Sequence, residues 1–197
     1  MRKYTSLSLS RYLSEVSSRK PIPGGGSVSA YAACLGIALA EMVAQIGMTK
    51  VEPSTKSSLQ KTIQLLQRAR KDALEIVDLD PQVYQKVLAN YKKAKRIRER
   101  AKKDERIDEA LENSFRLQAN LALLVTLAKE AVRSLQGCVR GSIQNDLRVS
   151  QALLKAAFQG AYDTAEINRV SMKDPEKKAR AAQALEEVKR RFEADGS

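Results

Sequence analysis

The chain has 197 residues, of which 43% are apolar, and its 35 basic and 23 acidic residues give a formal net charge of +12. A chain of this length and apolar content can bury its own core as one domain, residues 1–197, without disulfides or metals. It contains no histidine, which excludes the usual general base near neutral pH and the commonest zinc ligand. We therefore expect no metal site and no covalently bound cofactor, and any catalysis must use Asp, Glu, Lys, Tyr or backbone groups.

The two cysteines and the N-terminal segment indicate a cellular compartment. Cys34 and Cys138 lie far apart and match no metal-binding or redox spacing, so we expect free thiols in a reducing environment. The first residues lack the apolar stretch of a secretory signal, and no window of about 18 uninterrupted apolar residues occurs. These features predict a cytoplasmic protein that does not span a membrane.

Glycine and proline are few and fall between periodic segments, which predicts roughly seven helices and no strands. Ser8 is expected to cap a first helix that ends at residues 21–26 (PIPGGG). Ser27 is expected to cap the second, residues 28–48, whose small residues on nearly every face indicate a buried central helix. Such a helix in a small domain often finds part of its cover on a second subunit, so we predict a homodimer.

Proline positions set the expected starts of several later helices, because proline is favoured in the first helical turn. These helices are expected over residues 53–78, from residue 81 onward, over 107–135 and 142–170, and from residue 175 within a charged C-terminal segment, 171–197. The sequence therefore predicts an all-α, single-domain helical bundle around a central helix rich in small residues.

Residues 86–106 carry ten basic and three acidic residues, a net charge of +7. Such a run can lie along the phosphate backbone of a nucleic acid, or it can be a solvated helix face. The chain has 5% aromatic residues, no tryptophan and no recognised nucleic-acid motif, so there is little to stack on bases. We do not expect a nucleic-acid partner.

Three consecutive glycines, Gly24, Gly25 and Gly26, lead directly into the second predicted helix. They suit either a packing turn or a cradle for a ligand, because the free amides of a helix N-terminus can receive a carboxylate or a carbonyl oxygen. The spacing matches neither the Walker phosphate loop nor the dinucleotide-binding fingerprint. The residues alone leave both interpretations open.

A family resemblance favours the ligand cradle. The segment 20–30 (KPIPGGGSVSA), followed by 39–43 (LAEMV), resembles the opening signature of the formiminotetrahydrofolate cyclodeaminase and methenyltetrahydrofolate cyclohydrolase family. The likeness continues in family order through 80–84 (DPQVY), Tyr91 with Lys95, Asn145 with Asp146, and Gly160 to Asn168. It covers most of residues 7–170.

The resemblance implies a helical homodimeric enzyme whose substrate is a tetrahydrofolate derivative, including one with a polyglutamate tail. The reaction would be hydrolysis of 5,10-methenyltetrahydrofolate to 10-formyltetrahydrofolate, or cyclisation of 5-formiminotetrahydrofolate to the methenyl form with release of ammonia. Both move protons at one carbon flanked by two nitrogens, which a single carboxylate can do.

The family pattern implies catalytic roles for Asp80 and Lys95. On local pattern alone, Asp80 is a helix cap before Pro81 and Lys95 is one more solvated charge. The residues that the resemblance assigns to substrate binding are Pro23, Gly24, Gly25, Gly26, Ser27, Asn145, Asp146 and Asn168.

Five positions depart from the family pattern, namely Ala94, Val139, Arg140, Asn145 and Thr164, which replace Pro, Gly, Asn, Ser and Asn respectively. They leave open an alternative function, a catalytically impaired family member that acts as a folate-binding or basic helical interaction protein.

Geometry adds a constraint on two of the predicted site residues. Asp146 and Asn168 are 22 positions apart, so on one straight helix they would lie roughly 33 Å apart. Either that helix breaks, or the two residues bind different parts of a long ligand, or a dimer brings different ends together.

Overall fold

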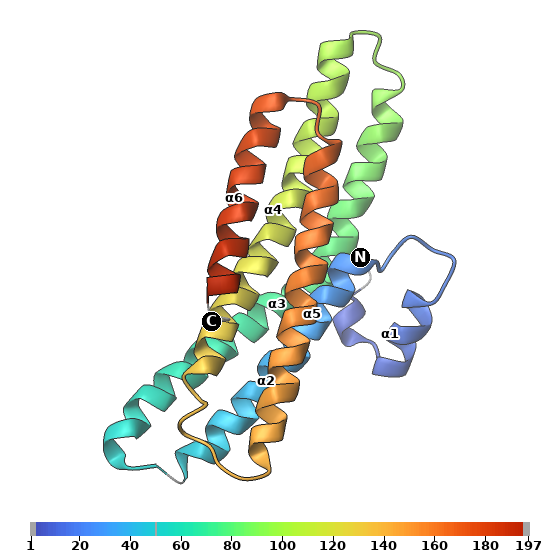
Figure 1. Ribbon diagram of the computed structural model, residues 1–197. Helices are drawn as coiled ribbons and strands as arrows, with labels where there is room; N and C mark the ends of the chain where they lie inside the picture. Colours follow the sequence, from blue (N-terminus) through green and yellow to red (C-terminus); the bar gives the residue numbers. More distant parts are fainter. Residues whose placement is uncertain (1–2, 50, 195–197) are drawn as a thin grey trace.

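The computed structural model describes residues 3–49 and 51–194, and within them it contains helices and no strands (Figure 1). A short 3-10 turn, η1 (Tyr4–Ser6), precedes six α-helices. They are α1 (Leu9–Val16), α2 (Gly25–Met48), α3 (Pro53–Ala94), α4 (Arg100–Arg133), α5 (Ile143–Ser171) and α6 (Pro175–Ala194). The predicted all-α fold is confirmed.

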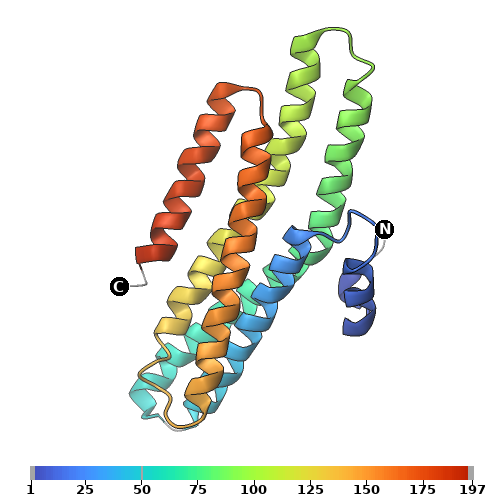
Figure 2. The same cartoon turned by 45° about the vertical axis from the view of Figure 1, so that its right-hand side comes forward.

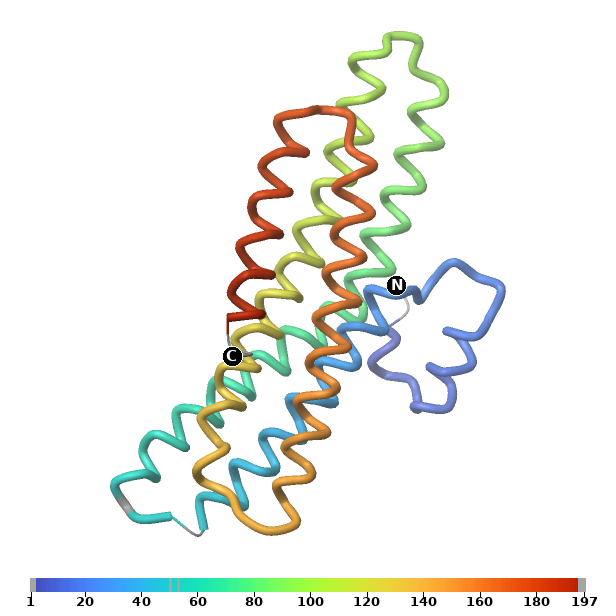
Figure 3. Tube along the Cα trace, in the orientation of Figure 1, coloured from blue at the N-terminus to red at the C-terminus, as the bar shows by residue number. Residues whose placement is uncertain are grey.

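The long helices form one elongated bundle (Figures 1 and 2). Helix α2 packs mainly between α3 and α5, α4 packs against α3 and α5, and α6 covers α4 and α5. The trace in Figure 3 shows the hairpin between α3 and α4 extending past the ends of α5 and α6. This hairpin carries the basic segment 86–106, whose side chains are mostly exposed.

Helix α2 is the buried central helix that the sequence predicted. Ala30, Ala33, Ile37 and Ala40 are completely buried on its inner side, where small side chains let the neighbouring backbones approach closely. Among the described helices, α2 alone is long and apolar enough to cross a membrane, but 61% of its most apolar window is buried inside the bundle. That burial is typical of a core helix.

The buried face of α2 includes one charged residue. Glu41 is 6% exposed and accepts a hydrogen bond of 2.6 Å from Nε of Arg70 on α3, with a second contact of 3.3 Å from the same guanidinium. A charge is tolerated in such a position when it is paired and hydrogen-bonded.

The predicted break between residues 78 and 81 does not exist, because α3 runs unbroken through Pro81. Proline has no N–H to donate to the carbonyl four residues earlier, which here is Val77. The Ser27 hydroxyl on α2 donates to that carbonyl at 2.8 Å. A side chain from another helix thus replaces the missing bond, and the helix continues.

The expected N-cap role of Ser27 is also wrong, and the cap that the local pattern alone indicated at Asp80 does not occur. Helix α2 begins at Gly25 with Gly24 as its N-cap, so Ser27 lies inside the first turn, and Asp80 lies inside α3 rather than before a helix. Asp80 instead accepts the Ser27 N–H through Oδ2 at 3.0 Å, and so caps α2 from α3. The predicted cap of the first helix is confirmed, since Oγ of Ser8 accepts from the N–H of Arg11.

The remaining helix boundaries differ less from those predicted from the sequence. Helix α4 begins at Arg100, seven residues before the predicted start, whereas α5 and α6 begin and end close to the expected positions. Both cysteines are free: Cys34 is buried, which raises the pKa of its thiol to about 12, and Cys138 is half-buried.

The role of Ser27 in supporting Pro81 can be tested by a double-mutant cycle. We expect Ser27→Ala to lower the free energy of unfolding by about 1–3 kcal/mol, because it leaves the buried Val77 carbonyl without a donor. In a Pro81→Ala background the new N–H of residue 81 can donate to that carbonyl, so the same substitution should cost less. Urea denaturation of the four proteins measures the coupling. Equal costs in both backgrounds would contradict this explanation.

Candidate functional site

A cavity of about 250 Å³ opens where the glycine loop meets α3, α4 and α5. Its lining residues are Pro21, Ile22, Gly24, Gly25, Gly26, Asp80, Tyr84, Ser114, Thr164, Ile167 and Asn168. The loop and three helices, far apart in sequence, therefore contribute to one concave surface. The first turn of α2 forms part of its wall.

Asp80 is the one carboxyl group among the described residues that line this cavity. Its side chain is held on both oxygens: Oδ2 accepts from the Ser27 N–H at 3.0 Å, and Oδ1 accepts from Nε2 of Gln118 at 2.7 Å. Asp80 is 8% exposed, and this burial raises its pKa, although both hydrogen bonds act in the opposite direction. A carboxylate with a raised pKa is a stronger base than an exposed aspartate.

One glycine of the run, Gly26, is explained by close approach of other side chains. A β-carbon at this position would lie 2.2 Å from Oδ1 of Asp80 and 2.2 Å from Nε2 of Gln118, well inside van der Waals contact. Unusual dihedrals are not the reason, because Gly141 is the only described residue with a positive φ. The structure therefore explains the glycine at position 26 by close approach, whereas a β-carbon at Gly24 or Gly25 would make only ordinary contacts.

Tyr12 on α1 contacts Ser27, the residue whose N–H donates to Asp80. The Ser27 hydroxyl has one proton, which it donates to the Val77 carbonyl, so the contact of 3.0 Å between the Tyr12 hydroxyl and Ser27 Oγ has Tyr12 as its donor. Tyr12 is 3% exposed, and its pKa is raised, first by burial and further by the nearby Asp80. Tyr12 is therefore protonated at neutral pH.

The α5 wall of the cavity presents polar side chains that are partly engaged with their own helix. Thr164 donates its hydroxyl to the carbonyl of Gly160 at 2.7 Å, and Nδ2 of Asn168 donates to the carbonyl of Thr164 at 2.7 Å. Oxygen acceptors of both side chains remain available to a ligand. Ile167, on the same wall, is 61% exposed.

The structure brings together only part of the predicted site. Asp80, Gly24, Gly25, Gly26 and Asn168 line the cavity. Two further predicted binding residues, Pro23 and Ser27, are buried next to it and do not line it.

Three predicted residues lie elsewhere. Lys95 is exposed at the C-terminal end of α3, 15 positions and about 22 Å along the helix from Asp80. Asn145 and Asp146 lie in the first turn of α5, and Asn168 lies near its last turn. Because α5 does not break, the first explanation offered for their separation is excluded.

No site role was predicted for Gln118 and Ser114 on α4 or for Tyr12, and Tyr84 on α3 appeared only within the segment 80–84 of the family resemblance. The available signal for the first two was their spacing: they lie four residues apart on the α4 face that also buries Leu111 and Leu121. A polar side chain on an apolar helix face must find a partner inside the protein.

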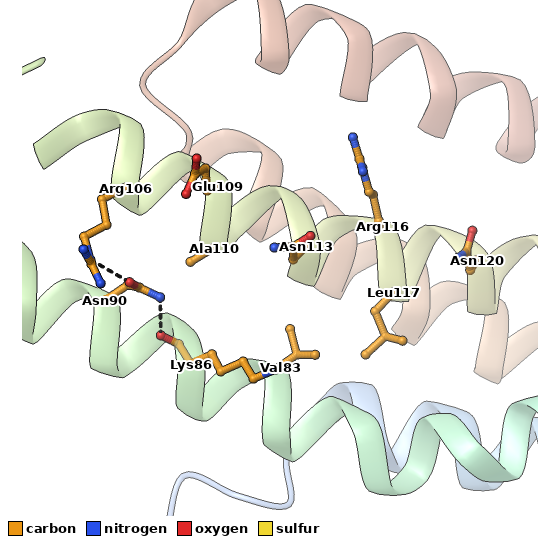
Figure 4. Close-up of a pocket in the computed structure, with 10 residues that line it drawn as sticks. All are labelled: Val83, Lys86, Asn90, Arg106, Glu109, Ala110, Asn113, Arg116, Leu117 and Asn120. Carbon is orange, nitrogen blue, oxygen red and sulfur yellow. Dashed lines mark hydrogen bonds between the residues drawn. The ribbon is translucent and has the colours of Figure 1, made fainter. Parts of the chain in front are cut away.

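A larger groove of about 530 Å³ lies between α3 and α4 (Figure 4). Its charged lining residues include Lys86, Arg106 and Arg116, and it contains Asn90, whose Oδ1 accepts from Nε of Arg106 at 2.9 Å. None of the predicted catalytic or binding residues lines it. We therefore place the candidate site in the smaller cavity around Asp80.

Gly26 and its neighbour provide a matched test of the close approach. Gly26→Ala should lower the free energy of unfolding by about 1–3 kcal/mol, as overpacking does, because Asp80 and Gln118 must move. In Gly25→Ala the new β-carbon lies 3.7 Å from Oγ1 of Thr164, an ordinary contact, so stability should change by less than about 1 kcal/mol. Thermal and urea denaturation compare them. Equal stability of the two variants would refute the close-packing account.

Comparison with known proteins agrees with this architecture. A family model described as formiminotransferase-cyclodeaminase matches residues 8–187. The formimidoyltransferase-cyclodeaminase of Rattus norvegicus is 31% identical over 169 residues, which cover 85% of this chain and 31% of that protein. The corresponding Gallus gallus protein is 28% identical over 187 residues, which cover 92% of this chain and 35% of that protein. The chain thus spans about a third of the length of these relatives.

The crystal structure of formiminotetrahydrofolate cyclodeaminase from Thermotoga maritima has the same fold. It superposes with a TM-score of 0.85 at 22% identity and covers 96% of this chain and 92% of that chain. Together with the family model, which matches nearly the whole chain, these relatives show that the protein belongs to the formiminotransferase-cyclodeaminase family.

Proposed function

We propose that this protein is an enzyme of one-carbon folate metabolism that moves protons at the bridging carbon of a tetrahydrofolate derivative, with Asp80 as its general base and acid. The observation that carries the proposal is the Asp80 carboxylate, which lines a cavity and is held by Ser27 and Gln118. Family membership supports the substrate class, and the positive net charge suits an anionic folate tail.

The chemistry of either reaction fits one carboxylate. In hydrolysis, Asp80 takes a proton from the water that attacks the methenyl carbon and returns it to N5 as the bond from that carbon to N5 breaks. The remaining hydroxyl proton is released to solvent as the carbonyl of the 10-formyl product forms. In cyclisation, Asp80 takes the N10 proton as N10 attacks the carbon of the protonated formimino group, and returns it to the resulting amino group, which leaves as ammonia as the methenyl cation forms. In both cases the same group acts first as base and then as acid.

The size of the cavity restricts which part of the substrate it can hold. Pockets for small ligands usually measure about 300–1,000 Å³, so a cavity of about 250 Å³ suits the reacting part of a folate while the tail lies outside. In this proposal the available oxygen acceptors of Thr164 and Asn168 hold the N–H groups of the reduced pterin.

Asp80→Asn tests the catalytic assignment. Asn keeps the shape of the side chain and can still accept from Ser27, but it cannot take up a proton, so turnover should fall by about 10²–10⁴-fold. The assay follows the near-ultraviolet absorbance of 5,10-methenyltetrahydrofolate, which hydrolysis removes and cyclisation of the 5-formimino form creates. Asp72→Asn, an exposed position on the same helix, serves as the control. Wild-type rates in Asp80→Asn would reject the assignment.

The pH dependence provides a second readout of the same variant. Because burial raises the pKa of Asp80, activity should fall with decreasing pH at a midpoint above the ordinary value of about 4. The folded state also holds this proton more tightly than the unfolded state. The contribution of Asp80 to stability is therefore largest below its ordinary pKa and is lost as pH rises through the raised pKa. Asp80→Asn should lack this component.

The alternative function, a catalytically impaired member that binds folate or acts as a basic interaction protein, is favoured by one observation. Thr164 stands where the family has asparagine, and its hydroxyl proton is donated within its own helix, so a donor that an asparagine would supply to the cavity is missing. Methenyltetrahydrofolate that binds without turnover would support the impaired enzyme. Oligonucleotide binding that falls steeply with salt would support a role for the basic hairpin.

We also propose a cytoplasmic homodimer formed through the outer face of α2. Val28, Leu35 and Met42 repeat every seven residues along that face and are 40%, 49% and 39% exposed. A second copy packed against this stripe would remove three large apolar side chains from water. The two free thiols fit a reducing cytoplasm.

Leu35→Asp should weaken or abolish the dimer, because it places a charge in the middle of the stripe. Sedimentation equilibrium, or light scattering after size-exclusion chromatography, measures the mass. Leu9→Asp on α1, where the leucine is 54% exposed, should leave the mass unchanged. The proposed interface is wrong if the wild type is monomeric or if the Leu35 variant stays dimeric.

A further inference from the structure

Gln118 is a buried residue of α4 whose side-chain amide oxygen has no hydrogen-bond partner. Its side chain is 0% exposed, and Nε2 donates to Oδ1 of Asp80 at 2.7 Å. Its Oε1 is the single fully buried side-chain polar atom, within the described part of the chain, that has no hydrogen-bond partner. Buried polar atoms without partners are rare and call for an explanation.

The present orientation of the amide follows from the charge of Asp80. A carboxylate can only accept hydrogen bonds, so the NH₂ group must face it. When Asp80 binds a proton on Oδ1 and this O–H points toward Gln118, two donors, the carboxylic O–H and the NH₂ group, face each other. Rotation of the terminal amide by half a turn resolves this conflict, because Oε1 then accepts from the O–H.

Among the described residues, no hydrogen bond other than the one to Asp80 holds the Gln118 amide in one orientation. In the present orientation Oε1 is unpartnered, and after rotation Nε2 would occupy the same unpartnered position. The cost of an unsatisfied buried group is therefore present in both states. The proton on Asp80 decides which state is preferred.

We propose that Gln118 is a positioning residue whose amide follows the protonation of Asp80, donating through Nε2 to the carboxylate and accepting through Oε1 from the carboxylic acid. The carboxyl group then stays anchored in both states, while the Ser27 N–H holds Oδ2 throughout. The proton taken up at Oδ1 is held toward Oε1 until the O–H turns to the leaving group. The catalytic part of this inference rests on the proposed function, whereas the rotation of the amide does not.

Few other groups can complicate the titration of Asp80. Tyr12 from α1 contacts Ser27, and Tyr84 from α3 lines the cavity. The residues that α4 and α5 contribute to the cavity, Ser114, Thr164, Ile167 and Asn168, carry no group that titrates near neutral pH. A shift in the pH at which turnover falls on the acidic side of its pH profile therefore reports on Asp80.

Two variants separate the proposed role from simple packing. Gln118→Met keeps the volume but removes donor and acceptor, so the ionisation midpoint of Asp80 should rise by about one pH unit, a tenfold change in its ionisation constant. Gln118→Glu keeps the shape and adds a second carboxyl, which should also raise the midpoint of the pair. In Gln64→Met, an exposed position on α3, the midpoint should not move.

The midpoint is measured by infrared difference spectroscopy of the carboxyl band, with Asp80→Asn as the blank, and by the pH profile of turnover. In the wild type, the side-chain amide resonances of Gln118 should titrate together with Asp80, and in Asp80→Asn they should not. KM should change little in both Gln118 variants, while kcat falls at low pH.

The outcomes distinguish the two proposals. A shifted midpoint in a protein that turns over no folate would retain the role of the amide and reject the proposed function. An unchanged Asp80 midpoint in folded Gln118→Met and Gln118→Glu, or wild-type Gln118 resonances that ignore pH, would overturn the inference. Near-ultraviolet circular dichroism checks that each variant is folded.

Discussion

The rest of the site depends on the carboxylate of Asp80, a residue of α3 that contacts the first turn of α2. A buried carboxylate is costly unless donors or charges compensate it. Here the compensation is a helix N-terminal amide from Ser27 and a neutral amide from Gln118, and no ion pair to Asp80 occurs in the described residues. The helix end supplies only a partial positive charge. The carboxylate is therefore held in place while desolvation still raises its pKa, and these are the two properties that a proton shuttle needs.

The contact between Ser27 and α3 also explains how the glycine run and Pro81, two features that usually interrupt helices, occur together. A glycine run without a capping side chain leaves the first amides of α2 free, and Asp80 accepts one of them. Pro81 leaves the Val77 carbonyl free, and the Ser27 hydroxyl donates to it. Each helix thus provides what the other lacks. The site lies where local backbone rules are broken, and the compensation comes from residues about 50 positions away.

This long-range compensation also separates what the sequence could predict from what it could not. Helical periodicity was sufficient for the all-α fold and for the burial of α2, because those features depend on side chains within one helix. The continuous α3 was not predictable, since a local rule sees the missing N–H of Pro81 and not the hydroxyl of Ser27. Asp80 came from the family resemblance, because its local pattern indicated only a cap. Gln118 belongs to no motif, and its one signal was a polar residue on a buried helix face.

The straight course of α5 limits how the family's remaining residues can act. Asn168 lines the cavity, and Asp146 lies at the other end of the same helix, about 33 Å away. Helix α2 runs antiparallel to α5, so its C-terminal end, where Gly47 meets Val139, lies on the side of Asp146. In the proposed homodimer, a two-fold axis perpendicular to α2 near Leu35, midway along the exposed stripe, would make the two α2 helices antiparallel. Such an arrangement would bring the Asp146 end of one bundle beside the cavity end of the other. A dimer of this kind through α2 would explain why residues so far apart in one chain belong to one family pattern.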